Sequence, residues 1–92
     1  MDQVEALGLL AAALEPHRQL SYADLVGRIG QHVVLEQVGA SGASYQIEIE
    51  VVWDSDVGGA VRAIGSIDDG GWRAIVPLTA DFIMGSDGLR DE

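Results

Sequence analysis

The residues of this chain that could bind a metal or a cofactor lie mostly in two acidic turns. Asp54-Ser55-Asp56, followed after Val57 by two glycines, has the spacing that begins a calcium-binding EF-hand loop. The twelfth position of such a loop needs a bidentate glutamate, and in this chain that position is Gly65. Asp68-Asp69-Gly70-Gly71 is explained by turn geometry, because Asp and Gly tolerate the backbone conformations of tight hairpins. We therefore expect no metal site and no cofactor.

Candidate catalytic residues are few. His17 and His32 have neither a second histidine nor a carboxylate at ligand spacing. The chain has no cysteine, which excludes thiolate nucleophiles and disulfides. It also has no Gly-x-Ser-x-Gly turn to present a serine nucleophile, and no glycine loop that opens a helix to hold phosphate. Glu48 and Glu50 share one strand face, but no cleft is indicated that would raise one pKa. We therefore expect a protein that is not an enzyme.

Charge narrows the classes of partner. The 92 residues include 15 acidic and five basic side chains, for a net charge of −10. Such a field repels phosphate backbones and anionic lipids, so we expect no nucleic-acid and no membrane partner, whereas a basic protein would be attracted. The apolar run Leu7–Leu14 is too short to cross a bilayer, and no basic residue precedes it as in a signal peptide. A cytoplasmic location is the resulting expectation.

Three strands organise the rest of the chain: Tyr45–Trp53, Ala60–Asp68 and Trp72–Val76. The first has a strict alternation of apolar and polar residues over nine positions, which is typical of a half-buried strand. Closing the first turn pairs Trp53 with Val61, and closing the second pairs Ile67 with Trp72 and Ala63 with Val76. His32–Val38 is a further strand, paired so that Leu35 faces Ile47. Phe82–Met84 is a possible edge strand after Pro77.

Two helices are predicted before the strands. Asp2 can cap a helix that ends at Glu15, because Pro16 disfavours helical geometry in the residue before it. Ser21 can cap a second helix over Tyr22–Ile29, which stops at Gly30. The first helix is apolar nearly all round. Its predicted core face is Val4, Leu7, Leu10, Ala11 and Leu14, which leaves Leu9 and Ala13 on a second side.

These elements predict an α+β fold, with two N-terminal helices packed on one face of a four- to five-stranded antiparallel β-meander. An SH3-like curled barrel is the alternative, since Gly65 could bend the sheet. The length favours a single domain over residues 1–92. Its helical part covers 1–31, its sheet 32–84, and a mobile tail 85–92.

Two surfaces of this fold are apolar without an evident role in the core. One is the second side of the first helix. The other is the outer sheet face, where Ile64 and Ile75 should be opposite each other among ion-paired arginines and glutamates. An apolar cluster rimmed by charges is typical of protein contacts. The candidate protein-contact residues are Leu9, Ala13, Val34, Val52, Arg62, Ile64, Arg73 and Ile75.

The functional prediction is a small acidic, non-enzymatic protein-interaction domain that self-associates into a homo-oligomer through the N-terminal helix, the outer sheet face or both. The alternative is an acidic inhibitor or immunity-like protein that neutralises a basic protein partner. An enzyme of unknown type is the third hypothesis.

Overall fold

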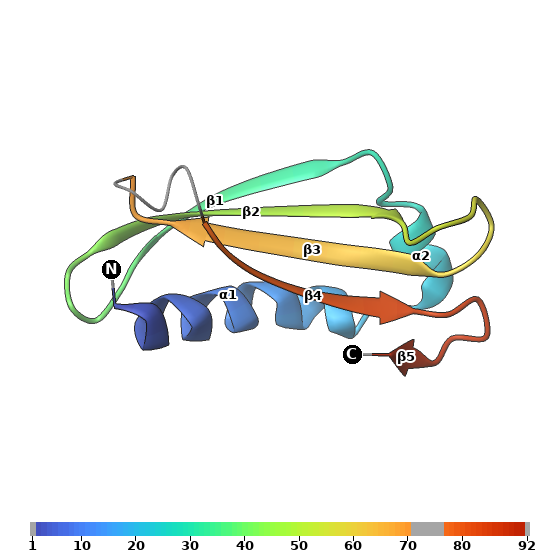
Figure 1. The fold of residues 1–92 in the computed structure, drawn as a ribbon, viewed down its shortest axis with the longest axis horizontal. Coiled ribbons are helices and arrows are strands. Elements are labelled where there is room, and N and C mark those ends of the chain that lie inside the picture. Colours follow the sequence, from blue (N-terminus) through green and yellow to red (C-terminus); the bar gives the residue numbers. More distant parts are fainter. Residues whose placement is uncertain (1, 71–76, 92) are drawn as a thin grey trace.

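A computed structural model gives the fold of the chain and describes residues 2–70 and 77–91. It is an α+β fold in which one long helix lies along one face of an antiparallel sheet (Figure 1). The strands follow one another across the sheet in chain order. The elements are α1 (Gln3–Arg18), α2 (Tyr22–Val26), β1 (His32–Val38), β2 (Ser44–Trp53), β3 (Val61–Asp68), β4 (Leu78–Met84) and β5 (Arg90–Asp91).

The first two hairpins have the predicted register. Leu35 of β1 faces Ile47 of β2, and Trp53 of β2 faces Val61 of β3. Glycines with positive φ close both loops, Gly42 at 89° and Gly58 at 85°, a backbone region that glycine enters without a steric penalty. The alternation along β2 and β3 therefore sorts their side chains onto a core face and an outer face.

The prediction for the next strand was wrong. β3 pairs on its second side with β4, so that Ile67 faces Leu78 and Ala63 faces Phe82, and neither faces a residue of Trp72–Val76. The predicted strand Trp72–Val76 itself lies outside the described residues. Pro77, which follows the predicted strand, directly precedes β4, a position where a missing N–H is tolerated.

Helix α1 begins as predicted but runs further. The Asp2 carboxylate accepts a hydrogen bond from the Glu5 N–H at 3.0 Å, which caps the helix. The helix continues through Pro16 to Arg18 instead of ending at Glu15. Proline removes one backbone donor from the last turn, and the helix still closes with the Gln19 N–H donating to the Glu15 carbonyl at 3.3 Å. The proline preference therefore gave the wrong end.

The buried face of α1 also differs from the prediction. Ala6, Leu10 and Leu14 are fully buried, whereas Val4 is 85% exposed and Leu7 44% exposed. The reason lies at the centre of the sheet. A Cβ built on Gly65 would meet the Leu10 Cδ1 at 2.8 Å and the Leu14 side chain at 3.3 Å. The missing side chain at Gly65 therefore leaves space in the sheet, and the two leucines of α1 fill it.

Helix α2 is shorter than predicted and lies at one end of the molecule (Figure 1). It covers Tyr22–Val26 and is followed by turns up to Gly30. The Ser21 hydroxyl accepts from the Asp24 N–H at 3.1 Å, which confirms the predicted cap. The Tyr22 hydroxyl donates to the Gly59 carbonyl at 2.7 Å and so joins α2 to the β2–β3 loop. Only α1 runs along the sheet, where the sequence had predicted two packed helices.

The sheet is open, with β1 at one edge and β5 at the other. Pairing between these two edges, which a barrel would need, does not occur in the described parts of the chain. Residues predicted to be a mobile tail turn back at Gly88, where φ is 83°, and Arg90 pairs with Met84. The molecule is accordingly elongated, 40 × 22 × 18 Å.

A pair of Gly→Ala substitutions tests the seat of α1. Gly65→Ala should destabilise the fold by about 1–3 kcal/mol, because the new methyl group overpacks a core that is already filled by Leu10 and Leu14. Gly8→Ala adds the same methyl group on the exposed side of α1, where nothing lies within 4 Å, and should stabilise by about 1 kcal/mol through helix propensity. Chemical denaturation measures both, and equal effects would contradict the packing.

Candidate functional site

The two helix residues predicted to contact a partner lie against the protein's own core. Leu9 and Ala13 are half-buried and pack on the core cluster. They flank the buried stripe of Leu10 and Leu14. The second side of α1 is therefore largely used in folding. The large apolar residues that the helix does expose are Val4 and Leu7, which the sequence had predicted to be in the core.

The outer sheet face is organised by Arg62. Its guanidinium donates to the Asp54 carboxylate through Nε at 2.9 Å and Nη2 at 2.7 Å, and to Asp81 through Nη1 at 2.7 Å. The two carboxylates raise the pKa of Arg62 further, Asp54 being the larger influence. Arg62 therefore connects the end of β2 to β4 across β3. It pairs with Asp54 and Asp81, where the sequence had suggested Glu48 and Glu50.

The structure describes only part of the apolar cluster predicted on this face. Val52 and Ile64 are half-buried beside these ion pairs. The neighbours of Ile64 across the sheet are Glu50 on β2 and Asp81 on β4. Arg73 and Ile75, the remaining predicted contact residues on this face, lie outside the described residues. The described part of the outer face is therefore a mixed surface, in which half-buried apolar residues lie among ion pairs.

Strand β1 exposes three large apolar side chains. Val34 is 51% exposed, Leu35 36% and Val38 68%, so apolar side chains reach solvent from both faces of one strand. In β2 and β3, by contrast, alternate residues are fully buried. Among the candidate contact residues that the structure describes, Val34 is the one with an exposed apolar side chain.

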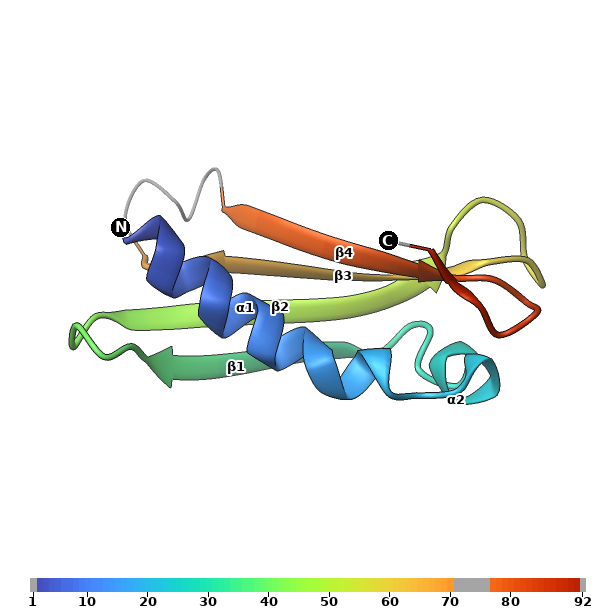
Figure 2. The same cartoon turned by 90° about the horizontal axis from the view of Figure 1, so that it is seen from below.

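The position of α1 explains this exposure. The helix crosses the sheet obliquely and packs mainly on β3 and β4 (Figure 2). Its contact with β2 is smaller, and its contact with β1 is slighter still. The core face of β1 consequently keeps only Val33 half-buried. Strand β1 is thus an edge strand with little cover on either face.

The hydrogen-bonding direction of β1 follows from its hairpin. The Gly39 N–H donates to the Ala43 carbonyl at 2.8 Å, so Gly39 faces β2 with its backbone polar groups. In an antiparallel pair this orientation alternates along the strand. The N–H and C=O groups of the even-numbered residues, His32, Val34, Glu36 and Val38, therefore point away from β2 toward the free edge. They are the groups that a further strand would bind.

Glu5 holds the far end of this edge strand in place. Its carboxylate accepts from the Ser41 N–H at 2.8 Å, the Ser41 hydroxyl at 2.7 Å and the Tyr45 hydroxyl at 2.7 Å. These donors lower the pKa of Glu5, and the same contact raises the pKa of Tyr45 to about 12. A Cβ at Gly39 would clash with the carboxylate, so the close approach needs a glycine there. Helix α1 thereby fixes the β1–β2 hairpin.

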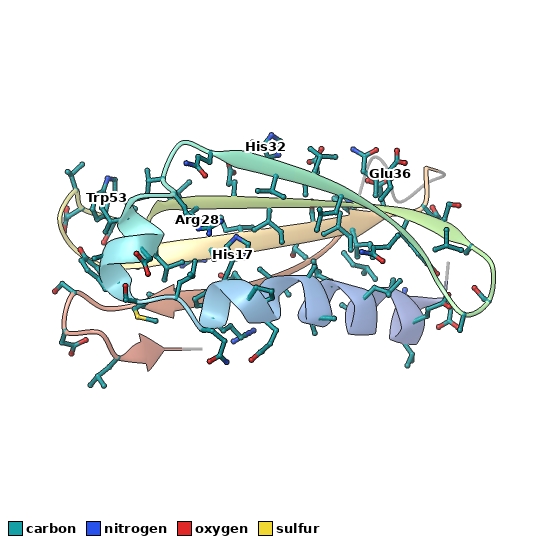
Figure 3. The ribbon with its side chains drawn as sticks, turned by 180° about the vertical axis from the view of Figure 1, so that it is seen from behind. His17, Arg28, His32, Glu36 and Trp53 are labelled. Carbon is teal, nitrogen blue, oxygen red and sulfur yellow. The ribbon has the colours of Figure 1, made fainter. Side chains whose placement is uncertain are left out.

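His17 is the buried polar side chain among the described residues. It lies beyond the helix end predicted at Glu15, in the last turn of α1, and is 8% exposed. Its Nδ1 has no partner at hydrogen-bonding geometry. Burial lowers the pKa of His17, as does the positive charge of Arg28, which lies beside it (Figure 3), while the Ala13 carbonyl favours the charged form and offsets part of this. Neutral His17 is a core residue and not a proton donor poised at a cleft.

Sites for ions or small molecules are not evident in residues 2–70 and 77–91. No group of three or more acidic or histidine side chains converges there as metal ligands would. A shallow depression lies where β1, β2 and β3 meet at the hairpin end, and its walls include Glu36, Gln37, Gln46, Asp68 and Asp69. Neither described helix is both long and apolar enough to cross a membrane.

The sequence contained a signal for the exposed edge that our prediction did not use. In a meander the first strand is an edge strand, and His32–Val38 has apolar residues on both faces. Leu35 and Val38 were therefore available as contact residues next to Val34. Glu5 gave no such signal, because its partners Ser41 and Tyr45 are 36 and 40 residues away.

Replacing Glu5 tests the link between α1 and the hairpin. Glu5→Gln replaces one carboxylate oxygen by an NH2 group, which cannot accept a hydrogen bond from any of the three donors around Glu5. We therefore expect a lower melting temperature at pH 7. Because folding lowers the pKa of Glu5, the stabilisation is present above its unfolded pKa near 4.5 and is lost as the pH falls through the folded value. Glu15→Gln is the control, since the Glu15 side chain is exposed and accepts only from Gln19. Equal losses in both variants would argue against the link.

His17 predicts a particular acid sensitivity. The unfolded chain binds a proton at His17 more readily than the folded protein, so stability should fall between about pH 7.5 and 5.5. His17→Leu should flatten this part of the profile and leave neutral stability unchanged or higher, since a buried unpaired nitrogen is removed. Leu25→Ala should lower stability at every pH without changing the slope. Denaturant unfolding at stepped pH gives the measurement, and an unchanged slope in His17→Leu would refute the assignment.

Comparison with known proteins does not assign the chain to a family. No protein-family model matches it, no curated protein matches it, and no solved structure matches it. The functional argument therefore depends on the geometry of the chain itself.

Proposed function

We propose that this protein is a small acidic, non-enzymatic interaction domain that self-associates through the free edge of β1. The observation that carries the proposal is that β1 exposes its backbone polar groups along one edge and apolar side chains on both faces. An open strand of this kind is a template for pairing with another strand. Self-association, as predicted from the sequence, is thus kept, with the edge of β1 in place of the N-terminal helix and the outer sheet face.

The strand has few of the features that usually protect an edge. It contains no proline and no lysine, its seven residues pair with β2 in continuous register without a bulge, and Glu36 is its one acidic side chain. Natural edge strands are commonly short, bulged or charged so that they do not pair with other chains. A weakly protected strand with exposed Val34, Leu35 and Val38 is what a strand-pairing interface would require.

The strong negative charge opposes self-association but does not prevent it. Two copies, each with a net charge of −10, repel one another. At physiological salt this repulsion is largely screened at separations beyond about 8–10 Å. Backbone hydrogen bonds and apolar contacts act at shorter distances. Association should therefore strengthen as the salt concentration rises, the opposite of binding between opposite charges.

Replacing Val34 tests the proposal. Val34→Lys puts a charge in the middle of the free edge and should weaken dimer formation at least about tenfold. Sedimentation velocity over a range of concentrations measures the dimer population. The control is Val57→Lys, because Val57 is also an exposed valine, lies in the β2–β3 loop away from the edge, and its replacement changes the net charge by the same amount. The proposal is wrong if the wild-type protein stays monomeric at high micromolar concentration.

A basic protein partner is the second candidate function. It is favoured by the depression at the hairpin end, whose walls carry Glu36, Asp68 and Asp69. A basic side chain seated there would neutralise part of the charge, as in an inhibitor or immunity-like protein. Binding of this kind weakens with added salt, so titration with a basic protein at low and high salt separates it from self-association. An enzyme of unknown type remains third, and no described group of residues supports a particular reaction.

A further inference from the structure

We propose that two copies join antiparallel through β1 about a two-fold axis at Val34, so that His32 of each copy faces Glu36 of the other. This inference rests on the proposed function and specifies the geometry of that same edge. Its occupant is a second copy of the chain. The argument has three steps: hydrogen-bond parity, charge, and contact across the two faces.

The direction of the backbone hydrogen bonds, which alternates between even- and odd-numbered residues, excludes half of the possible registers. The backbone groups that point to the free edge belong to the even-numbered residues of β1, as the Gly39 to Ala43 hydrogen bond indicates. When two identical strands pair antiparallel, these residues must face other even-numbered residues to exchange hydrogen bonds. The register is then centred on Val34, on Leu35 or on Glu36, or is displaced further with fewer pairs.

Charge distinguishes the three central registers. Centring on Glu36 places the two Glu36 side chains directly opposite one another, which is destabilising. Centring on Leu35 places Glu36 opposite Val34 and leaves His32 opposite Val38. Centring on Val34 places His32 opposite Glu36 twice, once on each side of the axis, and so pairs the acidic side chain of the free edge with an imidazole.

The side chains are already on the correct face for this pairing. His32 and Glu36 both project from the face opposite to α1 (Figure 3). Both side chains are exposed, and His32 has Glu48 of its own chain at 3.8 Å. In an antiparallel pair, directly opposite residues project from the same face. Contact between His32 and the second copy's Glu36 therefore needs no rearrangement of the strand.

The same register pairs the apolar residues of β1. On the core face Val33 of each copy lies opposite Leu35 of the other, and on the outer face the two Val34 side chains meet at the axis. Val33 and Leu35 are the residues that α1 leaves partly uncovered. The two sheets would then form one continuous sheet with both α1 helices on the same face. The partner strand would thus bury apolar side chains of β1 that α1 leaves partly exposed.

Single cysteines can locate the axis, because the chain contains no cysteine of its own. In the proposed register the two Val34 Cα atoms are about 5.5 Å apart, within the roughly 4.4–6.8 Å that a disulfide spans. Val34→Cys should therefore form a covalent dimer at least about tenfold faster than Val57→Cys in a glutathione buffer. Leu35→Cys and Glu36→Cys test the two neighbouring registers, and both variants should form the covalent dimer more slowly than Val34→Cys.

The outcomes separate the register from the proposed function. Fastest crosslinking by Leu35→Cys or Glu36→Cys overturns the Val34 axis while leaving pairing through β1 in place. Crosslinking no faster than Val57→Cys at all three positions, in a protein that sediments as a dimer, overturns β1 as the interface. A protein that sediments as a monomer overturns the proposed function together with this inference.

A charge exchange provides an independent measurement. His32→Glu places like charges opposite each other at two positions and should weaken the dimer, whereas His32→Glu with Glu36→Arg should restore much of the loss. The loss of the contact between His32 and Glu48 is common to both variants and cancels in a double-mutant cycle. Absence of coupling between the two positions would overturn the proposed pairing.

Discussion

The contact between Gly65 and the pair Leu10 and Leu14 determines much of this structure. Because β3 has no side chain at that point, α1 approaches the sheet closely enough to bury both leucines completely. Helix α1 therefore packs mainly on β3 and β4 and makes little contact with β1.

Two polar clusters then hold the elements in relation to that seat. Glu5 joins α1 to the hairpin through Ser41 and Tyr45, and Arg62 joins the end of β2 to β4 through Asp54 and Asp81. Each uses charged hydrogen bonds across elements that are distant in sequence. They rigidify the sheet at opposite places, and the edge strand is held in an extended form suited to pairing.

An edge strand of this kind is unusual for a protein that remains alone in solution. Leaving Val34, Leu35 and Val38 exposed gains nothing for the stability of the monomer, and an unpaired edge invites association. The high negative charge limits indiscriminate aggregation, since it repels other copies until close contacts form. Selective pairing of one strand is consistent with both features, and for this reason we place the function at β1 rather than at the more polar outer face.

The sequence by itself determined the features that depend on neighbours in the chain. The helix caps at Asp2 and Ser21, the pairing of β1 with β2 and of β2 with β3, and the acidic character were all predictable, because turn chemistry and period-two alternation act over short distances. Only the tertiary structure decided that Leu78–Met84 is the partner of β3, since the Asp and Gly residues after Ile67 predict a tight turn to the next residues of the chain. It also decided which side of α1 is buried. That helix is apolar nearly all round, so its own periodicity left the choice open, and the fit of Leu10 and Leu14 onto Gly65 settled it. The uncovered edge at β1 is a consequence of that fit.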